Sequence, residues 1–396
     1  MHGSLSCGSL LAWAAFGASL TLASNSTCIG INAVKPECKP AEPPYHRDVF
    51  FIGGEYVASG ASYIISDQMY VEKLTSTSGS DKPFPVVFIS AGLPSGNAWL
   101  NTPDNRKGWA SYFLEKGYQV YIVDITANGR SAQNDVGKYP LRLGSTVSIH
   151  ENGFTAPENL NAYPQSQGHD KWPGNGTKGD PVFDAFFAST VPLTSNSTAQ
   201  ELSMRAAGCK LLSLIGQSYL VGHSAGATYS ALMSDECPGK VRATINLEPG
   251  NIPFQSLIGN STVSGVGRTR SRPWGLTNSP LTYEPPVVNV TEDLVTVEVG
   301  EDTPALRSCF LQSNATAVRS LPQIAKVPYV MFTAANSPHI TYDHCFVSYL
   351  HQAGVMDVTW VKFGDLGLKG NGHFFFLEEN NMELAAVVEQ EIASRS

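Results

Sequence analysis

The stretch Tyr219-Leu-Val-Gly-His-Ser-Ala-Gly226 decides the fold class. Its first three residues predict a short buried strand, and the segment from Ala225 to Met233 predicts a helix. Residues 222–226 match G-x-S-x-G, a motif that presents a nucleophilic serine on the sharp turn between a strand and a helix. Glycine suits both ends of this turn because main chain packs against main chain there. We therefore expect Ser224 to be a nucleophile, the alternative being a tight turn with an idle serine.

Short apolar runs alternate with helical stretches on both sides of this motif. The predicted buried strands cover residues 85–90, 119–124, 219–221, 241–247, 328–332 and 358–363. The predicted helices lie near residues 108–116, 199–214, 225–233, 341–353 and 380–393. Before them, residues 48–74 predict an antiparallel hairpin with Tyr56-Val-Ala58 and Met69-Tyr-Val71 as strand centres. This alternation predicts an α/β fold with a mainly parallel, doubly wound sheet.

Two stretches, at about 139–180 and 251–320, lack clear periodicity. Long irregular segments inside a compact domain are either functional or disordered, and we interpret both as lid-like insertions over the top of the sheet. Aromatic residues in and just after the first insertion indicate an apolar lid or pocket wall, although aromatic side chains more often belong to a core. These residues are Tyr163, Trp172, Phe183, Phe186 and Phe187.

A serine nucleophile needs a base, and four histidines follow it in the chain. His373 comes after the strand 358–363 and the turn Gly370-Asn371-Gly372, just before the last helix, where this kind of fold places its base. His344 and His351 are seven residues apart in one predicted helix, which favours a packing or surface role. His339, in the loop after the strand 328–332, is the reserve candidate. We therefore predict His373 as the base.

The acid that orients this base is predicted one strand earlier than usual. The loop after the strand 328–332 has no carboxylate until Asp343, whereas Glu248 directly follows the buried strand 241–247. The two strand ends are neighbours on the top edge of the sheet, and a glutamate is one methylene longer than an aspartate. Glu248 is therefore the predicted acid, the alternative being a solvated carboxylate at a strand end.

Main-chain amides are the predicted oxyanion donors. The turn aims the amide of Ala225 at the developing oxyanion. A second amide is expected from the loop after the strand 85–90, from Gly92 or Leu93, with an ordinary glycine-rich turn as the alternative.

Export is predicted by three features of the chain. The apolar run 10–23 ends in a small-x-small pattern and predicts a signal peptide over residues 1–23, with a buried N-terminal helix as the alternative. An even set of cysteines remains, and we expect nearest neighbours to pair: Cys28 with Cys38, Cys209 with Cys237, and Cys309 with Cys345. N-glycosylation sequons occur at Asn25, Asn175, Asn196, Asn260, Asn289 and Asn314.

Composition narrows the class of partner. The chain is 42% hydrophobic and 15% charged, which is typical of a globular protein, and its net charge is −8. That charge argues against nucleic acid, and the single apolar run argues against a stable membrane anchor. No metal or cofactor is expected, since cysteines in an exported chain are better explained as disulfides. The oligomeric state is left open.

The matching motifs together resemble a small α/β-hydrolase family of secreted bacterial carboxylesterases, in which the acid is a glutamate after the sixth strand. The resemblance covers roughly residues 85–135, 218–252 and 325–393, including Ile245-Asn-Leu-Glu-Pro-Gly250 and Gly370-Asn-Gly-His373. It implies the same roles for Ser224, Glu248 and His373. One departure is that the family has a His-Gly pair and two adjacent cysteines in its oxyanion loop, where this chain has Ser90-Ala91 and Gly92-Leu93.

The sequence therefore predicts one α/β-hydrolase domain over residues 24–396 that cleaves a small, apolar or aromatic carboxylic ester through an acyl-enzyme. Three alternatives remain open. The same residues could carry out acyl transfer, lactonisation or cyclisation in a site that excludes water. They could cleave amides or peptides, or the fold could serve as a binding module without catalysis.

Overall fold

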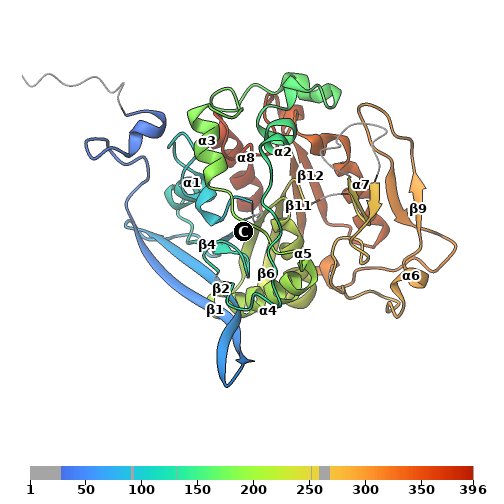
Figure 1. Ribbon diagram of the computed structural model, residues 1–396. Helices are drawn as coiled ribbons and strands as arrows, with labels where there is room; N and C mark the ends of the chain where they lie inside the picture. The colour runs from blue at the N-terminus through green and yellow to red at the C-terminus, as the bar shows by residue number, and fades with distance from the viewer. Residues whose placement is uncertain (1–27, 91–92, 132, 251, 258–267, 396) are drawn as a thin grey trace, which may run out of the picture.

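A mainly parallel sheet of eight strands organises the molecule, in the order β1-β2-β4-β3-β5-β6-β11-β12 (Figure 1). The computed structural model describes residues 28–90, 93–131, 133–250, 252–257 and 268–395. The strands of this sheet are β1 (Tyr45–Ser59), β2 (Ser62–Ser76), β3 (Val86–Ile89), β4 (Val120–Asp124), β5 (Ser218–His223), β6 (Val241–Leu247), β11 (Tyr329–Thr333) and β12 (Val358–Lys362). The pairings of β2 with β1 and with β4 are antiparallel, and the other pairings of this sheet are parallel. The α/β architecture predicted from the sequence is thus confirmed.

Helices cover both faces of the sheet, each over its own hydrophobic core. One core contains side chains of α4 (Ser197–Ile215), α5 (Gly226–Glu236) and α7 (Asp343–Gln352). The other contains side chains of α1 (Trp109–Glu115) and α8 (Asn381–Ala393). The central strand β3 serves both, because Val87 and Ile89 point into the first core and Val86 and Phe88 into the second. An apolar run buried on both faces is what the sequence of β3 predicts.

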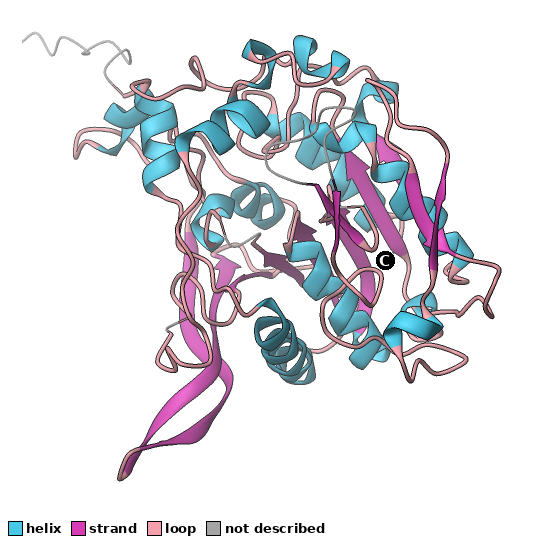
Figure 2. Cartoon of the chain, turned by 45° about the vertical axis from the view of Figure 1, so that its right-hand side comes forward, coloured by secondary structure: helices cyan, strands magenta, loops and turns pink. Residues whose placement is uncertain are grey.

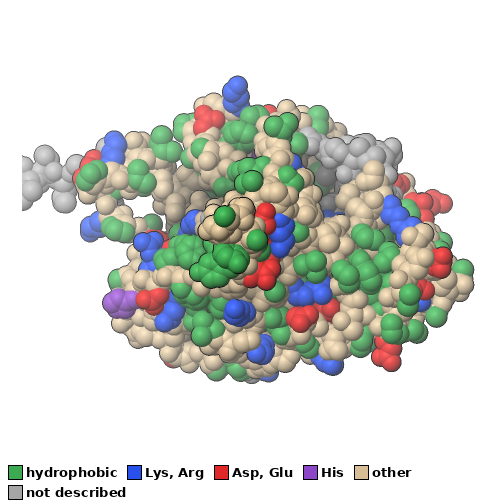
Figure 3. Space-filling model, turned by 60° about the horizontal axis from the view of Figure 1, so that its bottom comes forward, with side chains coloured by type: hydrophobic (Ala, Val, Ile, Leu, Met, Phe, Trp, Pro, Cys, Tyr) green, Lys and Arg blue, Asp and Glu red, His purple; other side chains and the backbone are tan. Residues whose placement is uncertain are grey.

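The β1–β2 hairpin is longer than its predicted strand centres and projects from the body of the protein (Figures 1 and 2). Its inner part packs on α4, where Gly53 contacts Ala207. Its outer part exposes aromatic side chains, with Tyr56 79% and Tyr63 69% accessible. Seen from below, hydrophobic side chains gather where the hairpin projects toward the viewer (Figure 3). Only the inner part of the hairpin therefore packs against the rest of the described chain.

The two insertions contain more regular structure than the sequence indicated. The first holds α2 (Val147–His150), a π-helical turn (Glu151–Thr155) and 3₁₀ turns (Pro157–Asn159 and Pro164–Gly168), and α3 (Pro181–Ala188) follows it. The second holds α6 (Val290–Asp293) and two antiparallel ribbons: β7 (Gln255–Leu257) with β8 (Arg268–Arg270), and β9 (Thr296–Val299) with β10 (Cys309–Gln312). Short ribbons escape prediction because three or four residues give too few repeats to show a period.

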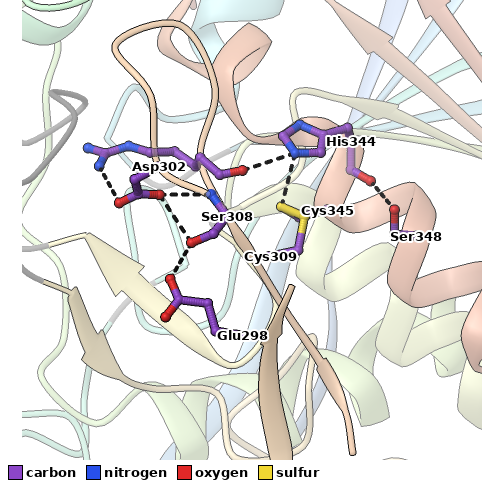
Figure 4. The surroundings of a disulfide bond; sticks show 8 residues. Glu298, Asp302, Ser308, Cys309, His344, Cys345 and Ser348 are labelled. Atoms are coloured by element: carbon purple, nitrogen blue, oxygen red, sulfur yellow. Dashed lines mark hydrogen bonds and ion pairs between the residues drawn. A yellow bond between two sulfur atoms is a disulfide. The ribbon is translucent and has the colours of Figure 1, made fainter. Parts of the chain in front are cut away.

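Three disulfides pair the cysteines as nearest neighbours: Cys28 with Cys38, Cys209 with Cys237, and Cys309 with Cys345. This pairing is the predicted one. The third disulfide joins β10 of the second insertion to the first turn of α7 (Figure 4). Beside it, His344 Nε2 lies 3.1 Å from the main-chain carbonyl of Arg307. This insertion is therefore attached covalently to the helix that follows the loop 334–342.

Several sequence predictions concern residues outside the described ranges. These are the signal peptide at 1–23, the sequons at Asn25 and Asn260, and the oxyanion candidate Gly92. Four further sequons, Asn175, Asn196, Asn289 and Asn314, have exposed side chains. None of the helices in the described ranges has the length and hydropathy needed to cross a membrane.

Candidate active site

Ser224 sits on the turn between β5 and α5 with a backbone that few residues adopt. Its φ is 51°, in the left-handed region, and its amide donates to the carbonyl of Leu247 at 2.9 Å. The flanking glycines are sterically required: a Cβ on Gly226 would lie 2.5 Å from the carbonyl oxygen of Ile89, and one on Gly222 would lie 2.8 Å from the amide nitrogen of Ala227. Helix α5 accordingly begins at Gly226, one residue later than predicted. The turn is a strained elbow between a strand and a helix, the geometry that the motif predicts.

Glu248 and His373 form a buried hydrogen-bonded pair. His373 Nδ1 lies 2.6 Å from Glu248 Oε2, and both side chains are almost fully buried. Glu248 also has a left-handed backbone, with φ of 49°. Two donors from the loop after β11 complete its shell: the amide of Ala334 at 2.8 Å and the hydroxyl of Ser337 at 2.6 Å. The carboxylate therefore comes from the end of β6, while the neighbouring loop after β11 holds it.

Burial disfavours charge on both members of this pair. It raises the pKa of Glu248 and lowers the pKa of His373 well below its usual value, the latter with a further contribution from His223 and His339. A neutral imidazole that donates from Nδ1 keeps a lone pair on Nε2. In the described part of the chain, the Ser224 hydroxyl makes no hydrogen bond to this imidazole. Such bonds often form only once substrate is bound.

The loop that carries His373 is fixed by a buried carboxylate, Glu378. Its oxygens accept from the amide of Gly372 at 3.0 Å and from Asn371 Nδ2 at 2.8 Å. His169 of the first insertion bridges Glu378, at 2.9 Å, and Glu158, at 2.8 Å. Burial opposes protonation of His169, but the hydrogen bonds to both carboxylates prevail and raise its pKa to about 9. A buried imidazolium therefore connects the first insertion to the loop of the candidate base.

His223 and Phe154 also contact the candidate base, and the sequence did not indicate either contact. His223, inside the motif itself, places Nε2 3.0 Å from the main-chain carbonyl of His373. Burial lowers the pKa of His223 to about 3, so this ring is neutral and can donate. The ring of Phe154 packs on His373 from another side, at a centroid distance of 5.0 Å. The sequence signal for His223 was its position directly before the serine of the G-x-S-x-G motif.

His339, the reserve candidate for the base, belongs to a second buried pair. Its Nδ1 lies 2.8 Å from Asp343 Oδ1, and Asp343 Oδ2 accepts from Thr333 Oγ1 at 2.6 Å. The His339 ring stacks on His373 instead of contacting Glu248 through a hydrogen bond. Glu248, His339 and His373 each offer a possible metal-ligand atom within 4.8 Å of one another. Both oxygens of Glu248 already accept hydrogen bonds from protein groups.

Of the three amides predicted as oxyanion donors, the structure describes those of Ala225 and Leu93 but not that of Gly92. Ala225 is exposed at the top of the turn, and among the described residues no group accepts a hydrogen bond from its amide. Leu93 is partly buried, and its carbonyl accepts from the amide of Val191 at 2.9 Å. The loop that contains Leu93 is anchored to the end of β4, because Asp124 accepts a hydrogen bond from the amide of Gly96 at 2.7 Å.

The aromatic residues assigned to a lid mostly fill a core. Four of them are 5% or less exposed: Tyr163, Trp172, Phe183 and Phe186. Phe186 packs on Phe374, and the ring of Phe374 in turn contacts His373. Only Phe187 is partly exposed. His344 is partly buried and His351 exposed, both in α7 as predicted.

The sheet order, the elbow and the buried pair define an α/β-hydrolase. The chain is 36% identical over 342 residues to the probable secreted lipase phiG of a fungal species (strain ATCC 74256), a match that covers 86% of this chain and 87% of that protein. The chain therefore belongs to the α/β-hydrolase family that includes this lipase. A bacterial esterase of known structure matches with a TM-score of 0.57 and 19% identity, over 90% of this chain and 99% of that one, and supports the fold. No family model matches the sequence.

Proposed function

We propose that the protein is a secreted serine hydrolase that cleaves carboxylic esters. The observation that carries the proposal is the 2.6 Å contact between Glu248 and His373 beside the elbow of Ser224. A hydroxyl at neutral pH needs an oriented, neutral imidazole to become a nucleophile, and burial keeps the pKa of His373 low enough to supply one. The family relationship to a probable secreted lipase supports esters as the substrate class.

The reaction follows from the geometry in two halves. Ser224 Oγ attacks the ester carbonyl while His373 Nε2 takes the hydroxyl proton, and the imidazolium then gives that proton to the departing alcohol. Water, deprotonated by the same imidazole, attacks the acyl-enzyme and releases the acid and Ser224. Glu248 accepts a hydrogen bond from Nδ1 throughout and stabilises the imidazolium.

The oxyanion is stabilised by main-chain amides. The amide of Ala225 is exposed and has no acceptor among the described residues, which suits a donor reserved for substrate. The second donor is assigned to the loop that contains Leu93. Because these amides are fixed by the turn and the loop, they need no rearrangement when charge develops.

Export is the remaining part of the proposal. Three disulfides suit an oxidising compartment, and the exposed sequons at Asn175, Asn196, Asn289 and Asn314 are open to glycosylation. Expression in a eukaryotic secretory host, followed by N-terminal sequencing and glycosidase treatment of the medium, tests both points.

A fluorophosphonate probe, located by peptide mass spectrometry, tests the mechanism together with turnover of p-nitrophenyl acetate and butyrate. We expect labelling of Ser224 and loss of both signals in Ser224→Ala and His373→Gln. His351→Gln is the matched control, because His351 is exposed on α7. Failure of folded wild-type protein to react would exclude the catalytic role, and labelling without turnover of any ester would favour acyl transfer.

A further inference from the structure

Arg272 is a partly buried cation beside the turn of the candidate nucleophile. It follows β8, the second strand of the β7–β8 ribbon in the second insertion. A Cβ placed on Gly250 would lie 3.9 Å from Arg272 Nη2. The amide of Gly250 in turn donates to the main-chain carbonyl of Ser224 at 3.0 Å. The main chain of one glycine therefore lies between the guanidinium and the elbow.

Among the described residues this guanidinium has a single hydrogen-bond acceptor, the carbonyl of Gln255, which lies 3.0 Å from Nη1. Within the described ranges no carboxylate lies at ion-pair distance from it. The same holds for the partly buried Arg205 and Arg242, whereas the more deeply buried Arg307 and Arg319 form ion pairs. Glu201 influences Arg272 only by its charge, since its oxygens accept from Asn278 and from the amide of Ser279. Toward the part of the chain that the structure describes, most N–H donors of Arg272 are therefore without an acceptor.

Holding such a group costs free energy in two ways. Removal of a charge from water is unfavourable unless a partner replaces the water, and burial accordingly lowers the pKa of Arg272. The backbone of Arg272 is also left-handed, with φ of 45°, a conformation disfavoured for residues other than glycine. Uncompensated charge and strain at one residue are typical of a site that is completed by a ligand.

The neighbours of Arg272 connect it to the rest of the candidate active site. Burial raises the pKa of Tyr342, and the nearby charges of Asp343, Glu248 and Arg272 all act on it. The ring of Tyr342 packs on His339 at 4.7 Å, and His339 stacks on His373. The acids on this side are engaged elsewhere, Asp343 with His339 and Glu248 with His373. A ligand anion is therefore the group that the free donors of Arg272 can pair with.

We propose that Arg272 binds a carboxylate of the substrate, so that the preferred substrates are esters that also carry an anionic group, such as hemi-esters of dicarboxylic acids. The planar guanidinium offers paired N–H donors that match the two oxygens of a carboxylate. This inference rests on the proposed esterase function and adds a charged end to the apolar ester expected from the sequence.

Matched ester pairs test the inference. The substrates are mono-p-nitrophenyl adipate, pimelate and suberate, each compared with the analogue whose free carboxylate is replaced by a neutral amide. The quantity measured is the ratio of kcat/KM for the charged ester to kcat/KM for the neutral one. For at least one chain length, the wild-type ratio should reach about 10 to 100, as expected of a charge-assisted hydrogen bond.

The variants are Arg272→Gln, Arg272→Lys and the matched control Arg270→Gln. Arg270 lies two residues away and is exposed, with Nη2 donating to the carbonyl of Leu294. Arg272→Gln should bring the ratio close to one, Arg272→Lys should give an intermediate ratio, and Arg270→Gln should keep the wild-type ratio.

Two results would overturn the inference: a wild-type ratio near one at every chain length, or an equal change of the ratio in the Arg272→Gln and Arg270→Gln variants. If Arg272→Gln fails to fold, the ratio of the wild type and the ratio of Arg272→Lys, which keeps the charge, still test the inference. Turnover of the neutral esters and labelling of Ser224 report on the esterase itself, so failure of the proposed function is seen separately.

Discussion

The imidazole rings of His339 and His373 are stacked, with planes 3° apart and centroids separated by 4.8 Å. His339 is in turn held by Asp343, so a second carboxylate–imidazole pair lies against the first. Charge on His339 disfavours charge on His373 and contributes, after burial and His223, to the lowered pKa of His373. The stacking therefore favours the neutral, proton-accepting form of the candidate base.

Replacement of His339 should change the pH dependence of catalysis. Activity requires neutral His373, so in the wild type kcat/KM should persist below pH 6.5 and fall only as pH drops through the lowered pKa. His339→Gln removes one cause of the lowering, and the acidic limb of the kcat/KM profile should move up by about half a pH unit. The profile for p-nitrophenyl butyrate measures this, with His351→Gln as control. An unchanged limb would mean that stacking has no electrostatic effect on the base.

Glu248→Gln should lower kcat strongly while the protein stays folded. The amide keeps the size of the side chain but offers the imidazole a neutral acceptor or a donor, which disfavours the correct tautomer and the imidazolium. We expect a loss of about a thousandfold or more in kcat, with a smaller change in KM. Steady-state kinetics measure this, and circular dichroism checks the fold. Near wild-type kcat would assign the acid to another residue.

Gly226→Ala should destabilise the protein at the elbow. The new Cβ would lie 2.5 Å from the carbonyl oxygen of Ile89, and β3 cannot move away without disturbing both cores. A loss of about 1 to 3 kcal/mol in the free energy of unfolding is expected, measured by urea denaturation. Gly239→Ala is the control, because a Cβ there meets nothing within 4 Å. Equal effects of the two substitutions would argue against a close approach at the elbow.

His169 should make stability depend on pH in the alkaline range. Its pKa in the folded state is raised to about 9, above the ordinary value of 6.5, so the folded protein binds the proton more tightly than the unfolded chain. The resulting stabilisation, roughly 3 kcal/mol, is complete below pH 6.5 and is lost as pH rises through about 9.

Thermal unfolding measured from pH 6 to 10 tests this dependence. The wild type should lose stability over that range more steeply than His169→Gln, whereas His351→Gln should follow the wild type. Parallel curves for the wild type and His169→Gln would exclude a charged bridge between Glu158 and Glu378.

Sequence predicted the parts of the site that depend on local chain geometry. The glycines around Ser224 report a turn in which main chain meets main chain, and Glu248 and His373 each follow a recognisable strand. Contacts between distant segments left no comparable pattern. His169 meets Glu378 across 209 residues of sequence, and the buried aromatic residues of the first insertion carry no period that separates core from lid. The stretch Arg268-Thr-Arg-Ser-Arg272 is typical of a solvated basic loop, and only the fold places Arg272 beside Gly250 with one hydrogen bond among the described residues.

The disulfide between Cys309 and Cys345 has a consequence for how the protein must be produced. Those cysteines are 36 residues apart, and their bond fastens the second insertion to the start of α7, directly after the loop that carries His339. In a reducing cytosol the sheet and the elbow can assemble without this fastening, while the insertion keeps only its non-covalent contacts. Recombinant protein should therefore be routed through an oxidising folding compartment, since without this bond only non-covalent contacts hold the second insertion, and Arg272 with it, beside the candidate active site.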